Sequence, residues 1–236
     1  MSEWAAKRFW KSAEVVPADD GFSVSLDGRM VKTPAKAALI VPTQRMADAI
    51  AIEWDAQTDK INPQSMPVTR GANAAIDKVA HQKAEVVEML AAYGDSDLLC
   101  YRAAGPDALI GLQCQAWDPL LDWAATELRA PLVSAEGVMH VPQDPVVLDR
   151  LTQEVAAQTP FQLAGFHDLV SLSGSLVLSL AVIREHLSPD QAWAVSRVDE
   201  EYQISQWGAD DEATDLAETK RAAFVQAADF FRMCLT

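Results

Sequence analysis

The chain has 236 residues, half of them hydrophobic, with 34 acidic and 19 basic side chains and a net charge of −15. The length predicts one large domain or two small ones, and the apolar share excludes a fully disordered chain. Nucleic-acid binding and attachment to anionic membranes both need clustered Lys and Arg, so the charge argues against both.

Targeting and redox signals are few. Cys100, Cys114 and Cys234 are widely spaced without a CxxC pair, which predicts neither a disulfide framework nor a cysteine zinc site and favours a reducing compartment. The start, MSEWAAKRFWK, lacks the apolar core of a signal peptide. The apolar stretch 169–183 is shorter than the roughly 20 residues of a membrane helix, so we expect a buried core helix there.

Strands are predicted in the first 42 or so residues. Apolar and polar residues alternate from Phe22 to Thr33 around Asp27-Gly28, which is a strong hairpin signal. Short apolar runs at 14–16 and 39–41 add strands to a small antiparallel sheet.

From Thr43, a plausible N-cap, the apolar period changes to that of helices. Met46, Ile50 and Trp54 share one face of the first helix. Later stripes predict helices over 72–93, 106–128, 145–158, 161–187 and 189–207, followed by one at the C-terminus. Asp118-Pro119 predicts a kink or a restart within the second of these. We therefore predict an α+β protein, with a small β-containing N-terminal domain, 1–66, and a helical bundle domain, 67–236.

Common catalytic motifs do not occur. There is no glycine-rich phosphate loop, no GxSxG and no HExxH, and His81, His140, His167 and His186 lack the partners of a metal site, so no cofactor or metal is expected. Two alternatives stay open. Cys100 would need a base to act as a nucleophile and is more typical of a buried hydrophobe. Asp118 and Asp122, at i and i+4, could crowd for acid–base work, although a capping and a solvated Asp explain them as well.

The C-terminal third is strongly acidic. Eight acidic residues and no Lys or Arg lie between Asp199 and Glu218. On a helical wheel Trp193, Ile204 and Trp207 share a face with Glu200 in its middle and Arg197 at its edge. A carboxylate in an apolar stripe needs a partner group, which is either Arg197 in an internal salt bridge or a group on a binding partner.

Seven segments together resemble the ATP12 family, the assembly chaperones of the F1 sector of ATP synthase. They are RFWK (8–11), LDGRMVKTP (26–34), EWDAQ (53–57), MPVT (66–69), DLLCYRA (97–103), WDPLLDW (117–123) and SRVDEEYQISQWG (196–208). The resemblance implies a two-domain chaperone that is not an enzyme and that binds the free F1 α subunit until the β subunit replaces it. It also implies functional acidic residues at Glu200 and Glu201. Mitochondrial relatives carry a transit peptide that this sequence lacks, so we expect a bacterial cytoplasmic protein.

The expected partner-binding residues lie in the acidic third of the chain: Glu200, Glu201, Trp207, Trp193, Arg197 and Asp210. The strong negative charge predicts a monomer, because copies repel one another. Two alternative functions remain: a small acidic enzyme that uses Asp118, Asp122 or Glu200 as acid or base, and a general protein-binding adaptor. A deep pocket at those carboxylates would favour the enzyme, and identification of the bound client would separate the adaptor from the assembly chaperone.

Overall fold

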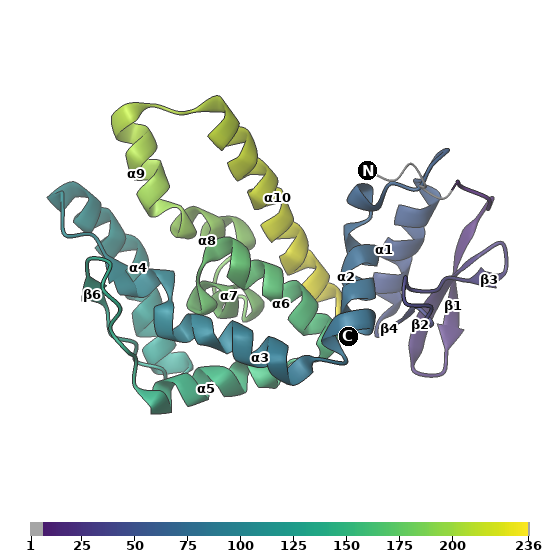
Figure 1. The fold of residues 1–236 in the computed structure, drawn as a ribbon, viewed down its shortest axis with the longest axis horizontal. Helices are drawn as coiled ribbons and strands as arrows, with labels where there is room; N and C mark the ends of the chain where they lie inside the picture. The colour runs from purple at the N-terminus through teal and green to yellow at the C-terminus, as the bar shows by residue number, and fades with distance from the viewer. Residues whose placement is uncertain (1–6, 236) are drawn as a thin grey trace. The chain divides into compact units, whose positions relative to one another are not determined.

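The structure, a computed structural model, describes residues 7–235, which form two compact units. Residues up to 83, with the segments 159–165 and 229–235, make the first unit, and residues 84–158 and 166–228 make the second. The first unit carries an antiparallel sheet and the second is built mainly of helices (Figure 1), which confirms the predicted α+β class. The predicted domains, 1–66 and 67–236, divide the chain differently and stay a prediction.

Strand β2 is the centre of the sheet in the first unit and pairs antiparallel with the other three strands. The strands are β1 (Ala13–Ala18), β2 (Gly21–Leu26), β3 (Arg29–Met30) and β4 (Ile40–Val41). The predicted hairpin is confirmed, since Leu26 lies opposite Arg29. Asp27 and Gly28 both have left-handed φ values, 48° and 81°, as a two-residue type I′ turn requires.

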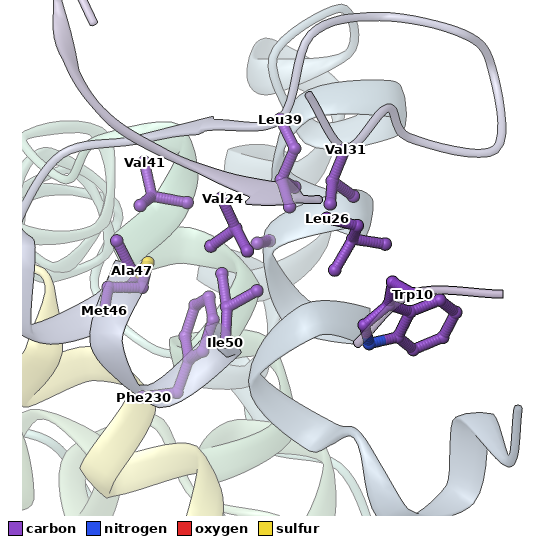
Figure 2. Close-up of a cluster of buried hydrophobic side chains, with 11 residues drawn as sticks. Trp10, Val24, Leu26, Val31, Leu39, Val41, Met46, Ala47, Ile50 and Phe230 are labelled. Carbon is purple, nitrogen blue, oxygen red and sulfur yellow. The ribbon is translucent and has the colours of Figure 1, made fainter. Parts of the chain in front are cut away.

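Helix α1 (Gln44–Asp55) begins where the sequence predicts. The Thr43 hydroxyl accepts a hydrogen bond from the Met46 backbone N–H at 3.2 Å, so Thr43 is the N-cap. Met46 and Ile50 are fully buried against the sheet, and Trp54 packs beside them with its ring 5.2 Å from that of Trp10. Figure 2 shows this core, made of Trp10, Val24, Leu26, Val31, Leu39, Val41, Met46, Ala47, Ile50, Ala72 and Phe230.

The EWDAQ segment joins α1 to its surroundings. The Glu53 carboxylate accepts hydrogen bonds from the backbone N–H groups of Val68 and Thr69, at 2.7 and 2.8 Å, where α2 (Pro67–Ala74) begins. Gln57 accepts from the Asn62 N–H at 2.7 Å, in the turn before η1 (Pro63–Ser65). Each carboxylate or amide therefore satisfies backbone donors that helix starts and turns leave unpaired.

The second unit is helical apart from a two-stranded parallel pair. Its elements are α3 (Lys83–Ala91), η3 (Ala92–Ser96), η4 (Leu98–Cys100), β5 (Tyr101–Arg102), α4 (Asp107–Glu127), β6 (Ala135–Glu136), α5 (Pro145–Ala156), most of α6 (Pro160–Ser173), α7 (Leu176–Ile183), α8 (Pro189–Ser196), α9 (Val198–Trp207) and most of α10 (Asp211–Met233). Trp117 and Trp123 are buried. Every residue from Leu176 to Val182 is also buried, and none of the described helices is long and apolar enough to cross a membrane.

Buried Asp97 organises the middle of this unit. Its carboxylate accepts hydrogen bonds from the Leu99 N–H, the Val177 N–H and the Ser175 hydroxyl, at 3.0, 3.0 and 2.7 Å. It thereby caps both η4 and α7. Burial raises the pKa of this carboxyl group, and the three hydrogen bonds act in the opposite direction.

Three helices that the sequence predicted as continuous are interrupted, and one that it predicted to kink or restart is continuous. The helix expected over 72–93 passes through a π-helical turn, η2 (Ala75–Val79), before α3. The one expected over 161–187 breaks at Gly174, which has a left-handed φ of 69°. Of the two possibilities predicted at Asp118-Pro119, a kink or a restart, the restart does not occur, because α4 continues through Pro119. The helix expected over 189–207 breaks at Arg197, between α8 and α9.

Candidate functional site

Residues 198–220, which we call the arm, form the acidic surface of the second unit. Helix α9 leads away from α8, and the chain turns at its tip into the first turns of α10 (Figure 1). Most of its side chains are exposed, and the eight acidic residues between Asp199 and Glu218 all belong to it. A largely unpacked helical pair that carries eight carboxylates and one cation, Lys220, is a surface suited to another molecule rather than to the core.

Two hydrogen bonds from α4 hold the base of the arm and the end of α8 that precedes it. The Gln113 side-chain amide donates to the Asp199 carboxylate at 2.7 Å, and the Trp117 indole N–H donates to the Val195 carbonyl at 3.0 Å. Gln113 is buried, and its amide oxygen also accepts from the Ala103 N–H at 2.8 Å. The sequence did not predict that Gln113 and Asp199 form a pair, because no local pattern connects residues so far apart in the chain.

Glu200 lies at the start of α9 and is paired within the chain. Its carboxylate is 2.8 Å from the Arg197 guanidinium, whose plane lies over the Trp193 ring at 5.7 Å from the centroid. The Glu200 side chain is nonetheless 45% exposed. Glu200 therefore has the internal partner that the sequence offered, Arg197, and remains accessible to solvent, and Glu201 beside it is exposed.

The predicted stripe of Trp193, Ile204 and Trp207 does not exist as one face. The helix breaks at Arg197, and Trp193 is only 8% exposed, with its ring 5.8 Å from that of Phe224. Trp207, at the end of α9, is 79% exposed. The structure therefore corrects the prediction that the two tryptophans share one face: Trp193 packs in the core, and Trp207 lies at the surface.

The tip of the arm has its own turn chemistry. Gly208 has a left-handed φ of 86° and ends α9, where its N–H donates to the Ile204 carbonyl at 2.8 Å. Asp210 precedes α10 and its carboxylate accepts from the Ala213 N–H at 2.8 Å. Asp210 is therefore a helix cap as well as an exposed charge. Ile204 and Leu216 add exposed apolar side chains to the same arm.

The candidate catalytic residues have structural surroundings. Cys100 is buried, and desolvation together with the charge of Asp97 raises the pKa of its thiol to about 12, so it is protonated at neutral pH. Asp118 is exposed and pairs with Arg102 at 2.8 Å, and Asp122 is exposed on the next turn of α4. Within residues 7–235 no group of His, Cys, Asp and Glu is arranged to hold a metal ion.

The exposed acidic arm of the helical unit is a surface suited to another molecule, and the comparisons define the class of the protein as a chaperone. The family model of the ATP12 chaperone protein matches residues 7–125. The chain belongs to the ATP12 family, whose chaperones act in F1-ATPase assembly.

Relatives with known names match this chain over most of its length. The crystal structure of Atp12 from Paracoccus denitrificans is 50% identical, covers 98% of this chain and 100% of its own, and superposes with a TM-score of 0.95. The Atu1473 protein of Agrobacterium tumefaciens is 39% identical over 98% of this chain and 86% of its own, with a TM-score of 0.92. Protein atp12, mitochondrial, of Schizosaccharomyces pombe is 25% identical over 89% of this chain and 76% of its own length.

Proposed function

We propose that this chaperone binds the free α subunit of the F1 sector through its arm and shields the subunit interface of α until the β subunit takes its place. It acts as a monomer in the bacterial cytoplasm and carries out no catalysis. The observation that carries the proposal is the arm itself, which combines an exposed tryptophan, Trp207, with eight carboxylates and no cation between 199 and 218.

The physical requirement on such a chaperone explains this composition. A free subunit exposes an apolar surface that its neighbour covers in the complex, and such surfaces aggregate. The chaperone must bind that surface and later be displaced. Charges at the rim of an interface speed the encounter and discriminate between partners more than they add affinity, and an exposed aromatic residue supplies the anchor.

The test compares binding and stability in the same purified variants. Glu200→Gln removes the charge of a half-exposed ion pair, and pairs of that kind contribute about 0–1 kcal/mol, so we expect the free energy of unfolding to stay within about 1 kcal/mol of the parent. Trp207→Ala removes an exposed ring, and we expect little change in stability for the same reason.

Both variants should bind purified F1 α more weakly, because Glu200→Gln removes a rim charge that favours the encounter and Trp207→Ala removes the exposed aromatic anchor. Glu88→Gln is the matched control, since Glu88 is exposed on α3 outside the arm. Titration of labelled α and a melting curve of each variant give the two measurements. Unchanged affinity in both arm variants, or weakened binding that follows a large fall in melting temperature, contradicts the proposal.

A further inference from the structure

A second surface of the helical unit is apolar rather than acidic. Residues 131–143, which we call the finger, connect α4 to α5 and include β6. Val138 is 94% exposed and Met139 is 77% exposed, and Val133 and Val141 of the same segment are also exposed. Single exposed apolar side chains need no explanation, but several in one short segment mark a binding surface.

The finger is held in place rather than left loose. The Gln143 side chain accepts from the Val133 N–H and donates to the Val133 carbonyl, both at 2.8 Å, and so closes the base of the finger. His140 contacts the Tyr101 hydroxyl at 3.1 Å with one ring nitrogen and the Asp95 carboxylate at 3.2 Å with the other. A surface fixed in this way loses little conformational entropy when a partner binds.

Charge distinguishes the finger from the arm. Its sequence, PLVSAEGVMHVPQ, contains Glu136 as its one carboxylate and no Lys or Arg, in a chain of net charge −15. The fully buried centre of a protein interface is depleted of charge, and its rim is polar. The finger has the composition of such a centre, whereas the arm has that of a rim.

A chain of hydrogen bonds links the finger to the base of the arm. The Gly137 N–H donates to the Arg102 carbonyl at 2.8 Å, and the next residue, Ala103, donates to Gln113 at 2.8 Å. Gln113 in turn donates to Asp199 of α9 at 2.7 Å. The two surfaces therefore belong to one hydrogen-bonded framework within the second unit.

We infer that the finger is a second contact site for the client and takes an uncharged, apolar part of the client's subunit interface, next to the acidic contact made by the arm. This rests on the proposed function, because the client is the free F1 α subunit. The near absence of charge in the finger selects an uncharged, apolar occupant. If the acidic arm covered an apolar patch of the client, its carboxylates would lose water without gaining a partner. The uncharged finger covers such a patch without that cost. A second copy of this chain is disfavoured, since it would bring another net charge of −15 to the interface.

The experiment removes the apolar tip without disturbing the fold. In the double variant Val138→Ser, Met139→Gln, both positions are solvent-exposed, so the melting temperature should match that of the parent. We expect the Kd for purified F1 α to rise about tenfold, through faster dissociation. Ile52→Gln is the matched control, because Ile52 is an exposed apolar residue on α1, outside both surfaces, and its Kd should not change.

A crosslinking measurement gives an independent readout. With p-benzoylphenylalanine in place of Val138, irradiation of the complex should link the chaperone to α, and the same group in place of Ile52 should not. Parent-like affinity of the double variant, or no crosslink from position 138, overturns the inference.

Other outcomes identify what else could be wrong. If sedimentation shows a dimer of the parent that the double variant loses while α binding is unchanged, the occupant is a second copy and the inference falls. If the arm variants weaken binding and the finger variant does not, the finger inference fails and the proposed function stands. If the parent does not bind α, both fail.

Discussion

Gly71 lies in α2 where the helix passes the buried ring of Phe230. A Cβ atom at this position would stand 2.6 Å from Phe230 Cε2 and 2.9 Å from Cζ. That ring is part of the core in Figure 2 and has little freedom to move. Gly71→Ala should therefore lower the free energy of unfolding by about 1–3 kcal/mol, although alanine is the better helix former.

The matched control is the same substitution in α4. Nothing lies within 4 Å of a Cβ atom built on Gly111, which is exposed. Gly111→Ala should stabilise the protein by up to about 1 kcal/mol, because only helix propensity changes. Urea unfolding of both variants checks the pair, and a stabilised Gly71→Ala protein would show that the Phe230 ring yields.

Single residues were predictable where their chemistry is local. Thr43 bonds to Met46 three residues on, and Asp27-Gly28 forms its turn from its own two φ values, so the sequence was enough for both. Gln113 and Asp97 were not predictable as functional or structural centres. Their partners, Asp199 and Ser175, lie 86 and 78 residues away, and only the folded chain brings them together.

The C-terminal end of α1 is closed by an arginine from the preceding segment. Arg8 donates from Nη1 to the carbonyls of Asp55 and Gln57, at 2.6 and 2.5 Å, and from Nη2 to the Lys11 carbonyl at 3.1 Å. The Asp55 carbonyl is one of those that a helix end leaves unpaired, the Gln57 carbonyl lies just beyond that end, and a cation there also complements the helix dipole.

Arg8→Met should destabilise the protein by about 2 kcal/mol, because the hydrogen bonds from the charged guanidinium are lost and the backbone carbonyls that accepted them are left without a partner. Arg8→Lys keeps the charge but not the planar fork, so its effect should lie between those of Met and the parent. Arg45→Met, at an exposed position in the first turn of α1, is the control and should change little. The unfolding midpoint of each variant is the measurement, and equal midpoints for Arg8→Met and Arg45→Met would contradict this function of Arg8.

Whether a helix continues or breaks depended on contacts that the pattern does not contain. Gly174 gave a signal for the break between α6 and α7, although the apolar run across it favoured one helix. Nothing in the residues around Arg197 signals the break between α8 and α9. There, Trp117 bonds to Val195 and Gln113 to Asp199, and these contacts from α4 fix the two short helices separately.

That break changed the candidate site. With one continuous helix the sequence placed Trp193 and Trp207 on the same surface, and the structure separates a buried from an exposed tryptophan. The exposure of the acidic run, by contrast, follows from composition alone, because so many carboxylates stay in water.

Pro119 shows the opposite case within α4. A proline in a helix interior removes one backbone donor and usually kinks or ends the helix. Here Pro119 is exposed, so water can reach the carbonyl that loses its partner, while Trp117 and Leu120 on either side are buried. The packing of these neighbours outweighs the local penalty, which is why the helix does not restart at Asp118, one of the two possibilities that the sequence left open.

At the scale of the whole molecule, the charge is unevenly distributed. Eight carboxylates, about half of the net charge of −15, lie on the arm, while the finger carries one. The arm and the finger should therefore contribute to different steps of client binding. Long-range attraction acts on the encounter, and close apolar contact acts on the lifetime of the complex.

We accordingly predict that the association rate constant with F1 α falls as salt is raised from about 10 mM to 150 mM, because the Debye length shortens from about 30 Å to about 8 Å. The dissociation rate should change little. In the variant Glu201→Gln, Glu212→Gln, which removes two exposed carboxylates of the arm, the association rate should depend less steeply on salt. The finger variant should keep the parent's salt dependence and dissociate faster. Stopped-flow measurement of both rate constants separates these effects, and an identical salt dependence in the parent and the arm variant would show that the arm does not steer the encounter.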